Sequence, residues 1–311
     1  MVDEIKLLDP RQAIVTWVDI LGYRAMLKDQ KYSKAHQASR QLANFNANDN
    51  SAPSGDWETY RGTFPISDAV IRVVDAQAPH AKGALFCELF DMAINQLNAV
   101  LNGVVVSGGM CLGEVCLGSA DHRTPMGEAV GRAYELDESR WEPAICVDTN
   151  LISAFCSDVS FHQHAQKEEL DYTLPWLFIH EQHHFVNYLR AATQDQGELH
   201  DALEGHRRII IENYNDKNLP ARARAKYRFM RDYHNAFINW LLSDDGAPDR
   251  TNGYAFAESD TDIPSTLSKL RIETDTHDHA IRFWHKDTRG YVTYLADGQP
   301  AVPHITTNKK I

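Results

Sequence analysis

Residues 13–24, AIVTWVDILGYR, form an apolar run that ends on Asp19 and continues through Gly22. The apolar run predicts a buried strand over 13–19, and the residues after it predict a tight turn into a long helix over 22–46. A buried carboxylate is costly unless it is paired, hydrogen-bonded or bound to a cation. Asp19 therefore indicates either a cap for the following helix or a ligand for a metal ion.

The composition is that of an ordinary globular protein. The 311 residues carry a formal net charge of −12, with 43% hydrophobic and 24% charged residues. No stripe of Lys and Arg is present, so we expect no nucleic-acid partner, although a local basic pocket for a phosphorylated small molecule stays open. The first residues lack the order of a signal peptide and no apolar run is long enough to cross a bilayer, so we expect a cytoplasmic protein without a membrane partner. The five cysteines fit reduced core residues.

The rest of the first 190 residues predicts an α+β fold. A polar loop at 46–56 is followed by a hairpin that turns near Pro65, Ser67 and Asp68. The further elements expected are a helix at 79–103, two glycine-containing strands at 104–119, a helix at 127–139, a strand at 144–148, a helix at 149–155 and an extended run at 185–189. This order predicts an antiparallel-rich sheet covered by helices on one face, in a domain spanning residues 1–190.

Residues 191–311 predict a C-terminal helical extension and tail. Its expected elements are helices at 197–214 and 219–243, a polar loop at 244–265 and short strand-like runs at 280–285 and 291–296. The second helix is amphipathic, which predicts that it packs on the body of the protein or on a partner subunit.

Asp68 is the candidate partner of Asp19. If the first strand and the hairpin are neighbours, both carboxylates lie at one edge of the sheet. Two carboxylates and a backbone carbonyl suit Mg²⁺ or Mn²⁺, whose coordination substrate phosphates would complete. The N–H groups that follow Asp19 would face a polyphosphate. The alternative for each Asp is a helix cap or a turn residue.

Four segments taken in order, VDILGYR, ISDAVIRVV, SGGMCLGEVCLG and MGEAVGRAYELDE, resemble the class III nucleotide cyclases. The resemblance is greatest to the bacterial anti-phage pyrimidine cyclases of Pycsar systems and covers about residues 13–148. It implies that Asp19, Asp68 and the Ile20 carbonyl bind two divalent ions, Mn²⁺ or Mg²⁺. It also implies that the triphosphate is wrapped by Ile20, Leu21, Gly22, Tyr23 and Arg24. The implied reaction turns a nucleoside triphosphate into its 3′,5′-cyclic monophosphate and diphosphate.

Two positions depart from the purine-specific members in the base pocket. Phe64 stands where these cyclases have a polar base-reading residue, and Thr124 stands at the position of the partner reader. A ring at Phe64 would narrow the pocket and stack on a small base, while Thr124 would make one hydrogen bond. We therefore expect a pyrimidine substrate, with UTP favoured over CTP.

Three other departures remove the usual transition-state groups. Gly131 and Glu135 stand where the resemblance places Asn and Arg, and Ser107 replaces an Arg. The cations expected to substitute are Arg24, Arg61 and Arg132. Arg24 is the preferred catalytic candidate, and Arg132 is a further substrate-binding candidate. If none substitutes, the protein is instead a non-catalytic nucleotide sensor that keeps the fold.

The resemblance further implies a homodimer with composite sites. Asp19 and Asp68 of one chain would face Thr124 and the 127–135 helix of the other, and a separate effector would read the cyclic nucleotide in phage defence.

The pentapeptide HEQHH at 180–184 is a competing motif. His180, Glu181 and His184 satisfy the His-Glu-x-x-His pattern of zinc metalloproteases, with Glu198 as a distant third ligand. The motif works only on a helix, where the two His side chains lie one turn apart. The flanking residues LPWLFI and FVNYL predict extended chain, so this reading is the remote alternative.

Overall fold

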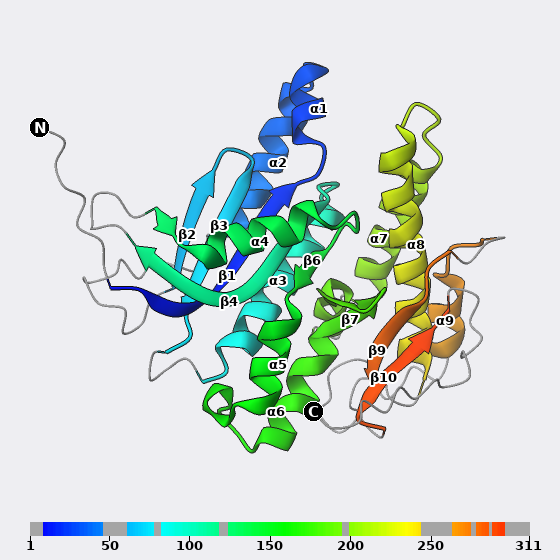
Figure 1. Ribbon diagram of the computed structural model, residues 1–311. Coiled ribbons are helices and arrows are strands. Elements are labelled where there is room, and N and C mark those ends of the chain that lie inside the picture. Colours follow the sequence, from blue (N-terminus) through cyan, green and yellow to red (C-terminus); the bar gives the residue numbers. More distant parts are fainter. Residues whose placement is uncertain are drawn as a thin grey trace, which may run out of the picture. The chain divides into compact units, whose positions relative to one another are not determined.

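The computed structural model describes residues 9–45, 61–77, 82–117, 124–194, 199–243, 263–274, 278–285 and 288–295 (Figure 1). The chain divides into two compact units, residues 1–91 with 104–170 and residues 92–103 with 171–310. The domain boundary near residue 190 stays a prediction. The polar loop expected at 46–56 and most of the loop expected at 244–265 lie outside the described residues.

The first unit is built on a mostly antiparallel sheet. Its central strand, β1 (Arg11–Ile20), pairs antiparallel with β3 (Ala69–Asp75) and with β4 (Val106–Leu117). At the edges, β2 (Arg61–Ile66) is antiparallel to β3, β6 (Ile145–Val147) is parallel to β4, and the short β5 (Pro125–Met126) also pairs with β4. The predicted strand, hairpin and α+β class are confirmed.

Helices cover both faces of this sheet. On one face, Ala13 and Val15 of β1 pack with Ala129 and Ala133 of α4 (Glu128–Glu138) in one apolar cluster. On the other face, the Thr16 hydroxyl donates a 2.9 Å hydrogen bond to Glu88 of α3 (Ala84–Leu101). Side chains alternate along a strand, so the two helices lie on opposite faces. The prediction of helices on one face was wrong, because every residue of β3 is buried and both faces therefore need cover.

The long helix expected at 22–46 is two helices. α1 (Tyr23–Lys28) and α2 (Tyr32–Asn44) are separated by a break at 29–31, where Gln30 has a φ of 57°. A non-glycine residue in the left-handed region does not continue a right-handed helix. Apolar spacing carries no sign of such a break, which is why one helix was predicted.

The two strands expected at 104–119 are the single strand β4. Its glycines predict close approach, and at Gly109 and Gly113 the approaching element is α4. A Cβ at Gly109 would lie 2.1 Å from the Ala133 carbonyl oxygen, and one at Gly113 would lie 3.0 Å from the Ala129 Cβ. The predicted elements that follow are confirmed as α4, β6 and α5 (Thr149–Ser157).

The second unit has its own antiparallel strands. They run in the order β10 (Gly290–Tyr294), β9 (Ile281–His285), β7 (Leu177–His180) and β8 (His183–Val186). The helices predicted in the extension are confirmed as α7 (Leu199–Tyr214) and α8 (Ala221–Leu242), and α9 (Ile263–Lys269) follows them. In α8 every residue from 229 to 241 is buried. Its buried polar side chains bind the later segments: the Asn235 amide, for example, donates to the Ile272 carbonyl at 2.8 Å and accepts from the Ile272 N–H at 2.8 Å.

One helix in the described part of the chain, α3, is long and apolar enough to cross a membrane by length and composition. A buried core helix passes the same test, and just over half of α3 (56%) is buried, so this is weak evidence for a membrane span.

Candidate active site

The ends of two neighbouring strands bring Asp19 and Asp68 together. Asp19 pairs with Ala69 on one side and with Ser107 on the other. Asp68 precedes Ala69 in the β2–β3 turn, where Ser67 has a φ of 58°. The N–H of Ile20 donates to the Asp68 carbonyl at 3.3 Å, which holds this turn against the end of β1.

The electrostatics of Asp19 show how closely acidic groups gather there. Burial, and after it the negative charges of Asp68 and Asp137, together raise the pKa of the Asp19 carboxyl to about 7. A hydrogen bond from the backbone of Ile20 and the charge of Arg24 act against this shift with smaller effect. At neutral pH the carboxyl is therefore poised between its two protonation states, as is common at functional sites.

Asp137 is the residue that the sequence analysis missed. It lies near the end of α4 and is buried, with 8% of its surface exposed. α4 comes this close to β1 because it packs directly on the bare backbone of β4 at Gly109, and because Tyr134 contacts Trp17 with ring centres 5.2 Å apart. The available signal was the spacing of Asp137 four residues after Ala133, which places both on the sheet side of the helix.

The donor set fits a hard divalent cation. Carboxylate and carbonyl oxygens are the ligands that Mg²⁺ and Mn²⁺ prefer. Asp19 and Asp68 supply carboxylates at one strand end, and a nearby dication would relieve the mutual repulsion that raises the Asp19 pKa.

The segment from Ile20 to Arg24 is only partly available to a ligand. The Leu21 N–H already donates to the Val105 carbonyl at 3.0 Å, and the Ile20 N–H is used by Asp68. Gly22 adopts a φ of 80° and has open space on its side-chain side, whereas the Tyr23 hydroxyl accepts a hydrogen bond from Ser39 at 3.2 Å. Arg24 is exposed. The expectation that all amides after Asp19 face a phosphate is therefore wrong for Ile20 and Leu21, because the sheet uses them.

Phe64 lies on the same face of the sheet as Asp19. It pairs with Ile71 of β3, which in turn pairs with Trp17 of β1, so the three form one row across the strands. Phe64 is half-buried against the apolar cluster under α4. From strand spacing and rise, its position is about 12 Å from that of Asp19, measured diagonally over two strands and two residues.

The remaining candidates lie on or beside α4. Thr124 is exposed just before β5, and Gly131 and Glu135 are exposed on α4. Arg132 forms an ion pair with Asp148 and donates to the Leu112 carbonyl at 3.3 Å, so its guanidinium is tied within the chain. Ser107 is buried beside Asp19 in the sheet. The side chain of Arg61 lies outside the described residues.

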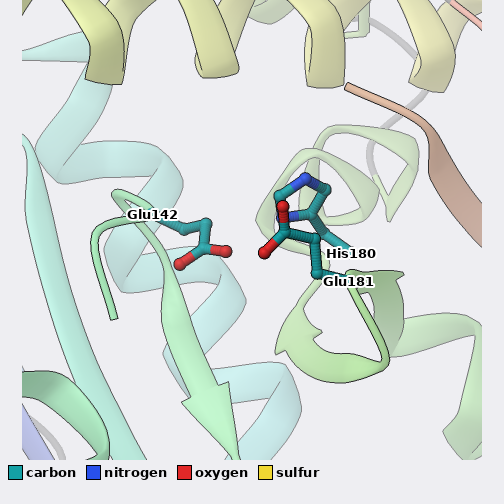
Figure 2. A group of neighbouring side chains, drawn as sticks. All are labelled: Glu142, His180 and Glu181. Carbon is teal, nitrogen blue, oxygen red and sulfur yellow. The ribbon is translucent and has the colours of Figure 1, made fainter. Parts of the chain in front are cut away.

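The HEQHH motif lies on a hairpin rather than on a helix. His180 ends β7 and Glu181 follows it in the turn (Figure 2). Glu181 and Gln182 have φ values of 46° and 73°, and His184 lies in β8. His180 pairs with His183 and His184 pairs with Ile179, so by alternation His180 and His184 lie on opposite faces. Their surroundings agree, since His180 contacts Phe229 whereas His184 contacts Tyr291. The zinc metalloprotease alternative is therefore wrong, and Glu198 lies outside the described residues.

No family model and no curated protein matches this sequence. Among solved structures, the chain is similar to the adenylyl cyclase CyaB from P. aeruginosa, at 14% identity over 48% of this chain and 81% of that one, with a TM-score of 0.36. It is also similar to the monomeric guanylyl cyclase domain of the RhoGC fusion protein from Blastocladiella emersonii, at 13% identity over 59% of this chain and 98% of that one, with a TM-score of 0.36. A class III adenylyl cyclase-like ATP-binding protein from P. aeruginosa matches at 14% identity over 47% of this chain and 35% of that one, with a TM-score of 0.33.

Proposed function

We propose that this protein is a nucleotide cyclase that converts a pyrimidine triphosphate, UTP in preference to CTP, into its 3′,5′-cyclic monophosphate and diphosphate. The observation that carries the proposal is the meeting of Asp19 and Asp68 at one strand end, close enough for the charge of Asp68 to help raise the pKa of Asp19. Two carboxylates crowded together in this way suit binding of divalent cations beneath a polyphosphate.

Each residue of the site has a distinct role in this reaction. Asp19 and Asp68, with the Ile20 carbonyl, hold the divalent ions, which when bound make the ribose 3′-hydroxyl more acidic and neutralise charge on the phosphates. Arg24 is exposed near Asp19 and is the cation best placed to approach the phosphates. It would take the transition-state role that a partner's Arg has in the family, because Glu135 stands at that position here.

The base is placed by Phe64. A ring on the Asp19 face, about 12 Å from that residue along the sheet, suits a nucleotide whose base stacks on Phe64 while its phosphates reach Asp19. An apolar ring offers no hydrogen bond to a purine edge. A pyrimidine base would therefore be selected over a purine by the size of the pocket and by a hydrogen bond with Thr124.

The proposal includes a homodimer with two composite sites. Thr124 and the exposed face of α4, with Gly131 and Glu135, would then meet the Asp19 site of the second copy. Met126 and Tyr134, with exposed fractions of 42% and 44%, offer apolar surface beside these residues. The product would be read by a separate effector in phage defence.

The test incubates purified protein with ATP, GTP, CTP or UTP and Mn²⁺, and separates the products by chromatography. Cyclic UMP is the expected main product, with less cyclic CMP. A cyclic purine as main product would contradict the role of Phe64. Asp19→Ala and Asp68→Ala should abolish turnover, while Asp29→Ala, at an exposed Asp that pairs with Lys31, should not.

A second candidate function is a nucleotide sensor without turnover. It is favoured by one observation, the exposure of Gly131 and Glu135 where the resemblance expects Asn and Arg. Calorimetric titration separates the two functions: saturable UTP binding with no product after prolonged incubation supports the sensor, whereas product formation excludes it.

A further inference from the structure

Arg190 lies between two tryptophan rings in the second unit. Its guanidinium carbon is 5.4 Å from the ring centre of Trp176 and 5.6 Å from that of Trp240. Trp176 ends the short helix η3 (Leu174–Trp176), Arg190 belongs to η4 (Tyr188–Gln194), and Trp240 belongs to α8. A cation between two indole faces is attracted by both ring quadrupoles. We call this arrangement the Trp–Arg–Trp slot.

The positive charge in the slot has no partner. Within the residues that the structure describes, no carboxylate forms an ion pair with Arg190, and its Nε is sealed from solvent without a hydrogen-bond acceptor. The two fully buried arginines in the described part of the chain are instead paired, Arg72 with Glu88 and Arg231 with Asp232. Burial lowers the pKa of Arg190 to about 10, so the group is still cationic at neutral pH.

The backbone that carries Arg190 is held by buried hydrogen bonds. The Asn187 N–H donates to the Trp176 carbonyl at 2.7 Å, and the Asn187 side-chain amide donates to the Pro175 carbonyl at 3.1 Å. The Tyr233 hydroxyl donates to the Asn187 side-chain oxygen at 2.7 Å and accepts from the Leu189 N–H at 3.1 Å. The chain on both sides of Trp176 and Arg190 is therefore fixed before any ligand arrives.

A second series of buried hydrogen bonds holds Tyr188, the residue next to Leu189. His234 Nε2 lies 3.0 Å from the Leu270 carbonyl, His234 Nδ1 lies 3.0 Å from His206 Nδ1, and His206 Nε2 lies 2.9 Å from the Tyr188 hydroxyl. A carbonyl only accepts, so His234 carries its proton on Nε2 and accepts at Nδ1 from His206, which accepts in turn from Tyr188. Burial lowers the pKa of both histidines, in agreement with two neutral rings. The donor and the acceptor of each of these three hydrogen bonds are thus set.

We propose that the Trp–Arg–Trp slot is a binding site for the oxyanion of a small molecule, a phosphate or a carboxylate group. The fold holds this guanidinium rigidly. Arg190 is half-buried, and of its guanidinium nitrogens Nε is sealed from solvent without a partner, whereas the two terminal nitrogens are not. A guanidinium fork binds such oxyanions through two parallel hydrogen bonds, and the aromatic faces keep the fork in one plane. The slot consists of residues of the second unit, whereas Asp19 belongs to the first, and the proposal does not depend on the nucleotide reaction.

The experiment titrates the full-length protein with inorganic phosphate or with acetate, at ionic strength held constant with sodium chloride. Trp176 and Trp240 face the charge, so intrinsic tryptophan fluorescence and calorimetry both report binding. We expect saturable binding of at least one probe with a midpoint on the order of 1 mM, typical of one bidentate contact. The probe that binds more tightly identifies the oxyanion class.

Variants decide whether the slot is the site. Arg190→Met keeps the aliphatic packing and should abolish the saturable signal, whereas Arg190→Lys should weaken binding at least about tenfold, because an ammonium lacks the fork. Arg208→Met, at an exposed position of α7, is the matched control and should bind as wild type does. If Arg190→Met does not fold, as judged by circular dichroism, the Lys variant still decides. A flat wild-type titration with both probes, or full binding by either Arg190 variant, would overturn the proposal.

Discussion

Replacing Asp19 with asparagine is expected to make the metal-free protein more stable at alkaline pH while it abolishes turnover. Asp19 is ionised above pH 7 although burial, Asp68 and Asp137 all disfavour its charge. Asparagine has nearly the same shape but no charge, so it removes the repulsion and keeps the packing. A site built to hold a cation is thus expected to cost stability in the absence of that cation.

The magnitude follows from the pKa. The rise of the Asp19 pKa from 3.8 to about 7 corresponds to a change of at most about 4 kcal/mol in the free energy of unfolding, at roughly 1.4 kcal/mol per pKa unit. Asp19 is half-buried and solvent screens its interactions, so we expect about 1–2 kcal/mol. For a domain of this size this raises Tm by about 3–6 °C.

The sign of the pH dependence of stability follows from the linkage between folding and the protonation of Asp19. The raised pKa means that the folded state binds more protons than the unfolded state between pH 3.8 and about 7. The stabilising contribution of protonated Asp19 is complete below this window and is lost as the pH rises through it. The wild type therefore loses stability across the window relative to Asp19→Asn, which has no such group.

The assay is thermal unfolding in the presence of a chelator, monitored by calorimetry at about pH 4 and at about pH 8. Asp19→Asn should unfold at a higher temperature than wild type near pH 8 and at nearly the same temperature near pH 4. Asp29→Asn is the control, because Asp29 is exposed and pairs with Lys31 at the surface. Added Mn²⁺ should stabilise the wild type more than the variant. A variant that is less stable near pH 8, or shows the same difference at both pH values, would refute the reasoning.

Three further substitutions test other parts of the structure. Gly109→Ala should destabilise the protein by about 2–3 kcal/mol in urea unfolding, because its Cβ would lie 2.1 Å from the Ala133 carbonyl oxygen, and an unchanged midpoint would contradict the close packing of α4. Gly131→Ala on the same helix meets nothing within 4 Å and should instead stabilise by about 0.5–1 kcal/mol through helix propensity, a gain that the same unfolding experiment detects. Glu181→Ala should leave nucleotide turnover within about twofold of wild type, because Glu181 is an exposed turn residue; complete loss of turnover in the chromatographic assay would revive a role for the HEQHH motif.

The local elements of this protein follow from its sequence alone. Hydrophobic periodicity reports local geometry, so it predicts secondary structure from the sequence. It marks the apolar run before Asp19, the hairpin around Asp68 and the helices α4, α7 and α8. The sequence placed Asp19 and Asp68 at the ends of two such elements, and their meeting depended on the condition that these elements are neighbours, which the pairing of β1 with β3 meets. The residues that flank HEQHH also predicted extended chain from the sequence alone, and this prediction correctly disfavoured a helical zinc site.

Only the tertiary structure decided which groups meet across elements. The approach of Asp137 to Asp19 depends on how closely α4 packs on Gly109, and packing distance has no signature in one sequence. The cover on both faces of the sheet and the use of the Leu21 amide by Val105 depend likewise on neighbours distant in the chain. The charge of Arg190 is the clearest case. Three separate elements place it beside Trp176 and Trp240 and leave it without a counter-ion among the described residues. Electrostatic partners depend on position in space and not on order along the polypeptide.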